Sequence, residues 1–272
     1  MRFNFLIFGL ALAAALLLSA PLDARPLDRP FDLLPGLPQL ASEDHPMPLD
    51  TDFNLVTAID VSDSITKQDE WLQYSGLTRG VLDPEFLARI AGGLQRRIGF
   101  IAFTWSSGGQ VAVVVPWTVI ETRADAEAVV AHLDAAPRID RRGFGMYRSL
   151  SSSVDVPRGG LTDIAEAVES AVRLSLTAPF ATRRSVINVL SNGVDNNGRD
   201  PSEVRDRAIR LGMTINGVVF GGNEGLPDYF RRHVVGGPGA FLMTVQQPTD
   251  LPRALEKKFW LDLIAGLAAS PS

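Results

Sequence analysis

Short apolar runs alternate with helix-type segments from residue 53 almost to the end of the chain. Most of the runs are continuous rather than alternating, which is typical of strands that helices cover on both faces. The pattern predicts an α/β domain with an open, doubly wound sheet. The predicted strands are Phe53–Ile59, Ile98–Phe103, Val111–Val115, Val186–Leu190, Ile215–Phe220 and Phe241–Val245.

One pair of predicted strands is too close in sequence to be parallel. Only Thr104–Gln110, which contains Ser106-Ser107-Gly108-Gly109, separates the second strand from the third. A connection of this length makes an antiparallel hairpin, because a parallel crossover needs a dozen residues or more. The sheet is therefore expected to be mostly parallel, with one antiparallel strand.

The other connections carry recognisable helix starts. A Thr followed three residues later by Asp predicts a capping box, and Asp-Pro predicts a capped first turn. These signals occur at Thr66/Asp69, Asp83-Pro84, Thr122/Asp125 and Asp200-Pro201, and Pro252–Ala265 is expected to be the closing helix.

The N-terminal segment has a different character. Arg2 precedes an apolar stretch that ends near Ala20, and this pattern predicts a secretory signal peptide over residues 1–24. An uncleaved membrane anchor is the alternative, because the stretch approaches membrane-spanning length. Residues 25–51 are rich in proline and are expected to form a linker, followed by the domain over residues 52–272. Either interpretation places the domain outside the cytoplasm, in the periplasm or secreted.

Composition narrows the classes of function. The 272 residues carry a formal net charge of −5, which argues against a dedicated nucleic-acid binder. The absence of cysteine excludes disulfides, thiolate zinc sites and cysteine nucleophiles. The sequence contains no G-x-S-x-G, Walker or H-E-x-x-H motif, so we expect a protein that is not an enzyme. Acid–base chemistry by carboxylates stays open.

The first predicted strand ends in a D-x-S-x-S element, formed by Asp60, Ser62 and Ser64. Three oxygen-bearing side chains at alternate positions suit a hard divalent cation such as Mg²⁺, which binds oxygen ligands at roughly 2.0–2.1 Å. In open α/β sheets, ligands bind beyond the carboxyl ends of the strands. We therefore expect Asp60 at a crevice rather than in the core.

Two later segments offer further oxygen ligands. Thr162 precedes the helical pattern Ile164–Leu176, where its hydroxyl would either bind a metal or cap the helix. Ser191–Gly198 follows the fourth predicted strand and includes Asn192 and Asp195. That segment would either face the same crevice or form an ordinary turn, since Asn, Asp and Gly are common turn residues.

The combination of Asp60-x-Ser62-x-Ser64, Thr162 and Leu190-Ser191-Asn192-Gly193 resembles a von Willebrand factor type A (vWA) domain. More narrowly, the chain is similar to an uncharacterised, exported bacterial branch of that fold. The resemblance covers about residues 54–258. The matching stretches are Glu70-Trp71-Leu72-Gln73, Arg97-Ile98-Gly99, Val115-Pro116-Trp117-Thr118-Val119-Ile120 and Asp195-Asn196-Asn197-Gly198.

This resemblance implies a metal-ion-dependent adhesion site (MIDAS), with one departure from the family pattern. The family's Asp on the third loop is Asn192 here, so the site loses a negative charge. Asp195 would compensate directly or through a water. The expected ion is Mg²⁺, Mn²⁺ or Ca²⁺, bound weakly. The implied ligands are Asp60, Ser62, Ser64, Thr162, Asn192 and Asp195.

The resemblance also implies a protein partner that offers an acidic side chain to the metal. Asp63 adds negative potential to the site. A basic and aromatic loop would contact the partner or simply face solvent, and it contains Arg141, Arg142, Phe144 and Tyr147. Contact with a membrane is expected only through an uncleaved N-terminal segment. The alternative functions are a metal-free scaffolding domain and, more distantly, a metal-assisted hydrolase.

Overall fold

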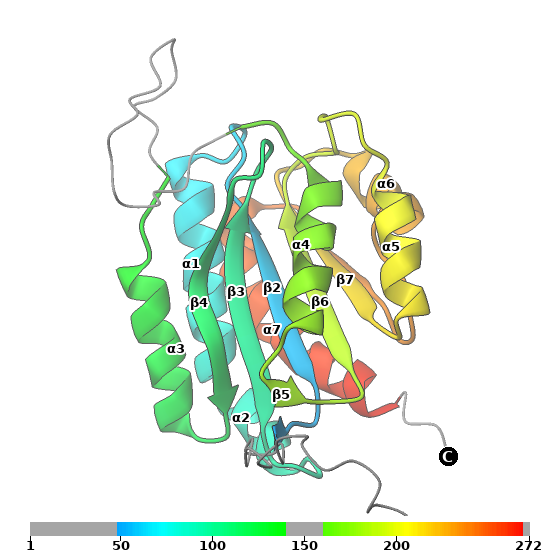
Figure 1. Ribbon diagram of the computed structural model, residues 1–272. Coiled ribbons are helices and arrows are strands. Elements are labelled where there is room, and N and C mark those ends of the chain that lie inside the picture. The colour runs from blue at the N-terminus through cyan, green and yellow to red at the C-terminus, as the bar shows by residue number, and fades with distance from the viewer. Residues whose placement is uncertain (1–47, 140–159, 269–272) are drawn as a thin grey trace, which may run out of the picture. The chain divides into compact units, whose positions relative to one another are not determined.

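The computed structural model describes residues 48–139 and 160–268, with side chains described as far as residue 264 (Figure 1). These residues form a six-stranded sheet in the order β4-β3-β2-β6-β7-β8. All neighbouring strands are parallel except β3 and β4, which form the expected antiparallel hairpin. The strands are β2 (Asn54–Asp60), β3 (Ile98–Trp105), β4 (Val111–Ile120), β6 (Ser185–Ser191), β7 (Thr214–Val219) and β8 (Leu242–Thr244).

Helices cover both faces of the sheet, as Figure 1 shows. One layer contains α4 (Ile164–Leu176), α5 (Pro201–Arg210) and α6 (Leu226–His233). The other contains α1 (Lys67–Leu82), α2 (Pro84–Ala91), α3 (Arg123–Ala135) and α7 (Leu251–Ala268). The fold is therefore the doubly wound α/β arrangement that the apolar pattern predicts.

The central strand β2 explains the continuous apolar runs. All seven of its residues are buried. Leu55 and Ile59 pack in the core beneath α1 and α7, whereas Val56 and Ala58 pack in the core beneath α4. Because successive side chains point to opposite faces of a strand, both sets of positions are mostly apolar when helices cover both faces.

Glycine brings α1 and α7 close together. A Cβ atom at Gly76 would lie 2.6 Å from the Leu255 side chain, and one at Gly80 would lie 2.6 Å from Phe259. Real Cβ contacts are not this short, so any larger residue at either position would push the two helices apart.

A buried charged pair ties α7 to the sheet. Lys258 and Asp262 are fully buried, with Lys258 Nζ 2.7 and 2.9 Å from the two carboxylate oxygens. Asn188 on β6 and Asn216 on β7 each donate a hydrogen bond of 2.9 Å to Asp262. Burial lowers the pKa of Lys258, and the attraction of Asp262 opposes that shift. Four bonds therefore satisfy the Asp262 carboxylate within an apolar layer.

The predicted helix starts are confirmed. Capping boxes occur at Thr66/Asp69 and Thr122/Asp125, and Asp83 and Asp200 cap the helices that begin with proline. A small parallel sheet of β1 (Leu49–Asp50) and β5 (Phe180–Ala181) was not predicted. Its strand β1 lies within the segment expected to be linker. None of the helices in the described ranges is both long and apolar enough to cross a membrane.

Candidate functional site

Three loops meet at the edge of the sheet where β2 and β6 end, at the top of Figure 1. They follow β2 (residues 61–66), precede α4 (residues 160–163) and follow β6 (residues 192–200). Parallel strands place their carboxyl ends at one edge, so residues far apart in sequence come together there.

Asp60 is the charged centre of this edge. Its side chain is fully buried beneath the loops, whereas the sequence predicted an open crevice position. One carboxylate oxygen accepts a hydrogen bond of 2.8 Å from the Ser62 backbone N–H, and the other accepts one of 2.7 Å from Ser191 Oγ. Burial raises the pKa of Asp60, and the hydrogen bonds from Ser62 and Ser191 oppose that rise. Among the described residues, no basic side chain forms an ion pair with it.

A chain of side-chain oxygens extends from Thr162 to Asn192. Thr162 Oγ1 donates to Ser62 Oγ at 3.3 Å, and Ser62 Oγ lies 3.2 Å from Ser64 Oγ. Ser64 Oγ donates to the side-chain oxygen of Asn192 at 2.6 Å. We name these four residues together with Asp60 the oxygen cluster.

Asn192 is bound to Ser64 in both directions. Besides accepting the bond from Ser64 Oγ, it donates from Nδ2 to the Ser64 backbone oxygen at 3.2 Å. A carboxylate could accept the first bond but could not donate the second. The oxygen and the nitrogen of the Asn192 side chain therefore each have a hydrogen-bond partner in Ser64 without a cation.

Thr162 does not cap α4. The N-cap is Asp163, whose Oδ1 accepts a hydrogen bond of 2.8 Å from the Glu166 N–H. The Thr162 hydroxyl turns instead toward Ser62, and the side chain is 3% exposed. The sequence left two roles open for Thr162, which were to cap α4 or to bind a metal. The structure excludes the cap and places the Thr162 hydroxyl in the oxygen cluster.

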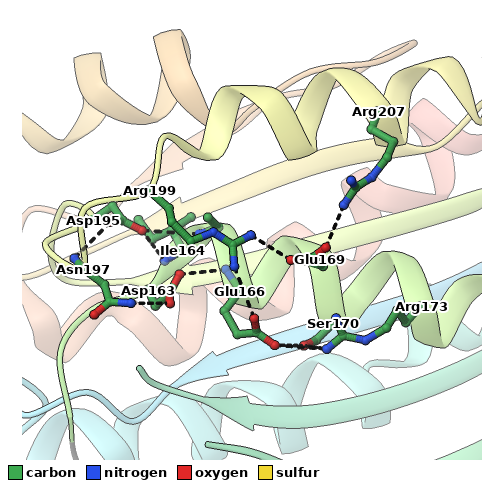
Figure 2. Close-up of polar contacts among 11 residues, drawn as sticks. Asp163, Ile164, Glu166, Glu169, Ser170, Arg173, Asp195, Asn197, Arg199 and Arg207 are labelled. Carbon is green, nitrogen blue, oxygen red and sulfur yellow. Dashed lines mark hydrogen bonds and ion pairs between the residues drawn. The ribbon is translucent and has the colours of Figure 1, made fainter. Parts of the chain in front are cut away.

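Asp195 lies against the start of α4 (Figure 2). Its Oδ2 accepts hydrogen bonds from the backbone N–H groups of Ile164, at 2.7 Å, and Ala165, at 3.3 Å. Its Oδ1 accepts one of 3.1 Å from the Asn197 N–H. Burial raises its pKa, as does the nearby charge of Asp163, while the backbone hydrogen bonds oppose the rise. Asp195 therefore holds the loop after β6 against the first residues of α4, and the structure shows no hydrogen bond from it to the oxygen cluster.

The predicted partner-contact residues divide into two groups. Asp63 is exposed at the rim, its backbone N–H donates to the Gly160 oxygen at 2.8 Å, and partial burial raises the pKa of its carboxyl. Arg141, Arg142, Phe144 and Tyr147 lie outside the described residues.

Sequence reasoning gave no individual role to several supporting residues, although Ser191 and Asn196 lie in a segment that it named. Gln73 on α1 donates to the Asp60 backbone oxygen at 2.9 Å, and Ser191 donates to the Asp60 carboxylate. The Asn196 side-chain oxygen accepts a bond of 2.8 Å from the Thr162 N–H. Ser191 could have been found, because it ends the strand beside Asp60. Gln73 gives no local signal, because its role depends on how α1 packs.

The donors of the oxygen cluster fit a hard cation. A carboxylate, three hydroxyls and an amide oxygen are ligand types that Mg²⁺, Mn²⁺ and Ca²⁺ accept. The buried Asp60 charge, which no described basic group balances, is the feature that a cation would relieve. Within the described residues, no group of three or more His, Cys, Asp or Glu side chains could hold a metal. Any ion here would therefore rely mostly on neutral oxygens.

Solved structures share this fold at low sequence identity. Proximal thread matrix protein 1 from the mussel byssus has 16% identity and a TM-score of 0.54, and a zinc-occupied MIDAS form of it has a TM-score of 0.51. The alignment covers 80% of this chain, which spans about half of the mussel chain (49%). A von Willebrand factor type A structure from Catenulispora acidiphila has 17% identity and a TM-score of 0.49, over 78% of this chain and 42% of that one.

Comparison by sequence gives a family without a described function. No curated protein matches the chain. A model of the family described as "Protein of unknown function (DUF1194)" matches residues 50–156 and 151–267. The resemblance to an uncharacterised vWA-like family is confirmed, and the predicted fold class is confirmed as well. The chain belongs to this DUF1194 family, and its domain has a vWA-like fold.

Proposed function

We propose that this protein is exported and binds a partner protein through a weakened metal-ion-dependent adhesion site. The observation that carries the proposal is the convergence of the oxygen cluster at the carboxyl edge of the sheet. Its five members come from the end of β2 and from the three loops. Hydrogen bonds within the cluster join residues 100 and 128 positions apart in the chain. In the mussel protein that shares the fold, a MIDAS motif is described as occupied by zinc.

The cluster residues would hold the cation by their oxygens. Asp60 supplies the only charge of the cluster, and Ser62, Ser64, Thr162 and Asn192 supply neutral oxygens. When bound, a divalent cation supplies an electrophilic position that can accept a carboxylate oxygen. Since the ligands neutralise only part of its charge, the site favours a Glu or Asp side chain from the partner.

Asn192 weakens the metal site because its side-chain oxygen is already hydrogen-bonded to Ser64. A cation must take the Asn192 oxygen from Ser64 and turn the hydroxyl protons away, which breaks the chain of hydrogen bonds already present. An Asp at this position would add Coulomb attraction and would lack the Nδ2–Ser64 bond. Asp195, which the sequence offered as compensation, is engaged with α4.

Calorimetric titration of the purified protein with Mg²⁺, Mn²⁺ and Ca²⁺ tests the metal site. We expect weak binding to the wild type and at least tenfold tighter binding to Asn192→Asp, as about 1.4 kcal/mol of added attraction would give. Asn223→Asp is the matched control, since it adds the same charge to an exposed residue beyond the neighbouring strand β7. Equal gains in the two variants, or no binding to either, would reject the site.

A metal-free scaffolding role is the second candidate. The self-satisfied Ser64–Asn192 pair favours it, because the cluster needs no cation to satisfy its hydrogen bonds. Binding that appears only after Asn192→Asp would support this role for the wild type. Export is a separate part of the proposal, and sequencing the N-terminus of the protein from cells tests it: an intact Met1 in the membrane fraction would favour an anchor.

A further inference from the structure

Two exposed apolar side chains are close in the chain to members of the oxygen cluster. Leu161 is 49% exposed and directly precedes Thr162, and Val194 is 37% exposed and follows Asn192 by two residues. The two loops touch, since a Cβ atom at Gly193 would lie 3.5 Å from Thr162 Oγ1. Exposed apolar side chains therefore lie on the same two loops that carry Thr162 and Asn192 of the polar oxygen cluster.

The backbone around Leu161 is fixed in place. Its N–H donates to Ser107 Oγ at 2.8 Å, and its carbonyl accepts a bond of 2.9 Å from the Ser107 N–H. The preceding carbonyl, of Gly160, accepts a bond of 2.8 Å from the Asp63 N–H. Since the backbone is already ordered, a partner that packs on this leucine loses little conformational entropy in the loop.

The loop that carries Val194 is fixed as firmly. The Asn196 N–H donates to the Thr162 carbonyl at 2.9 Å, and the Asn196 side chain accepts the Thr162 N–H at 2.8 Å. Asp195 holds the same loop against the start of α4. Both apolar side chains are therefore presented on prearranged backbone rather than on loose chain.

The charges of the site limit which partner side chains can bind near Leu161 and Val194. With a divalent cation, the single carboxylate of Asp60 leaves the cluster positive, which suits one incoming carboxylate. The exposed carboxylate of Asp63 on the rim would repel a second acidic side chain nearby. Bulky apolar neighbours of the acid would instead bury surface against Leu161 and Val194.

We propose that the partner segment at this site carries a single Glu or Asp flanked by bulky apolar side chains, which pack on Leu161 and Val194. This inference rests on the proposed function for the central carboxylate. The apolar contacts would supply part of the affinity that the weakened metal site lacks.

Three capped heptapeptides test it with the full-length protein in the presence of Mn²⁺. The first has a central glutamate between two leucines, the second has serines in place of the leucines, and the third has glutamine in place of the glutamate. We expect the first to bind roughly tenfold more tightly than the second, as partial burial of two apolar contacts gives. Leu161→Ser and Val194→Ser should each remove about threefold of this preference.

Leu211→Ser is the matched control, because Leu211 is 50% exposed just beyond the far end of α5, away from the cluster. It should keep the full preference for leucine. Equal, metal-dependent binding of the first two peptides would overturn the inference and leave the proposed function standing. Equal binding of the glutamate and glutamine peptides, unaffected by EDTA, would overturn the metal-carboxylate function and, with it, the acidic side chain of the inferred partner segment. A loss in Leu211→Ser equal to that in Leu161→Ser, or no binding of the first peptide, also overturns the inference.

Discussion

Ser64 donates a hydrogen bond of 2.6 Å to the side-chain oxygen of Asn192, and the Asn192 amide returns one to the Ser64 carbonyl. The two residues are 128 positions apart in the chain. This reciprocal pair closes the oxygen cluster on itself, so the stability of the domain without metal depends on the amide.

Asn192→Asp should lower the stability of the metal-free protein by about 1–2 kcal/mol, because the Ser64 carbonyl loses its donor and a second carboxylate approaches Asp60. Thermal melts in EDTA measure the loss. Added Mg²⁺ should then raise the melting temperature of the variant more than that of the wild type. Equal shifts in the two proteins would mean that residue 192 does not face the ion.

Asp60→Asn and Asp60→Ala should behave differently. The amide keeps an acceptor for the Ser62 N–H and removes a buried charge, so Asp60→Asn should be at least as stable as the metal-free wild type. Asp60→Ala leaves the buried Ser62 N–H without its acceptor, whereas Ser191 Oγ keeps the Gly193 carbonyl at 3.0 Å, and should cost about 1–3 kcal/mol. Both should abolish metal binding. Urea unfolding in EDTA compares their stabilities, and equal losses would contradict the burial argument.

Asp195→Ala should destabilise the domain by about 1–2 kcal/mol, since the first N–H groups of α4 lose their carboxylate partner. Its metal affinity should stay within about twofold of wild type, a difference of under ~0.5 kcal/mol. Calorimetry and thermal melts on the same sample separate the two effects. A loss of affinity as large as that of Asp60→Asn would make Asp195 a ligand.

Glu169 links α4 to the loop before α5 and to α5 itself (Figure 2). It forms ion pairs of 2.7 Å with Arg199 and 2.9 Å with Arg207, and the bond from Arg199 is the main cause of its lowered pKa. Because the pKa of Glu169 is lower in the folded than in the unfolded protein, its ion pairs stabilise the fold at pH values above the unfolded pKa. This stabilisation is lost as the pH falls through the folded pKa. Glu169→Gln should therefore cost about 0.5–1 kcal/mol at neutral pH, and the cost should vanish as the pH falls well below about 4. A pH-independent difference in urea unfolding would contradict this.

The buried pair on α7 should show strong coupling. Lys258→Met leaves the Asp262 carboxylate buried without its cation and should cost about 3–5 kcal/mol. The double variant Lys258→Met/Asp262→Asn has no buried charge and should recover part of that loss. A double-mutant cycle by chemical unfolding measures the coupling. If the stability losses of Lys258→Met and Asp262→Asn simply add in the double variant, the pair makes no net interaction.

The sequence by itself determined the six strands of the main sheet and their order along the chain, but not the small sheet of β1 and β5. Thr66 with Asp69, and Asp200 with Pro201, are local signals whose partners lie within one turn, so neighbouring residues decide them. The continuous apolar run of β2 likewise reports burial on both faces. The D-x-S-x-S element and Asn192 were identified in the same way, because each lies directly beyond a predicted strand.

Only the tertiary structure decided what these residues contact. The sequence left Thr162 as either a cap or a ligand and Asp195 as either a ligand or a turn residue. The approach of the loops assigned the cap to Asp163, placed Asp195 against α4 and turned Thr162 toward Ser62. Lys258 and Asp262 have the spacing of a solvated helix pair, yet packing of α7 on the sheet buries both. Such contacts join residues far apart in the chain, and their geometry depends on how whole elements pack, which no local pattern encodes.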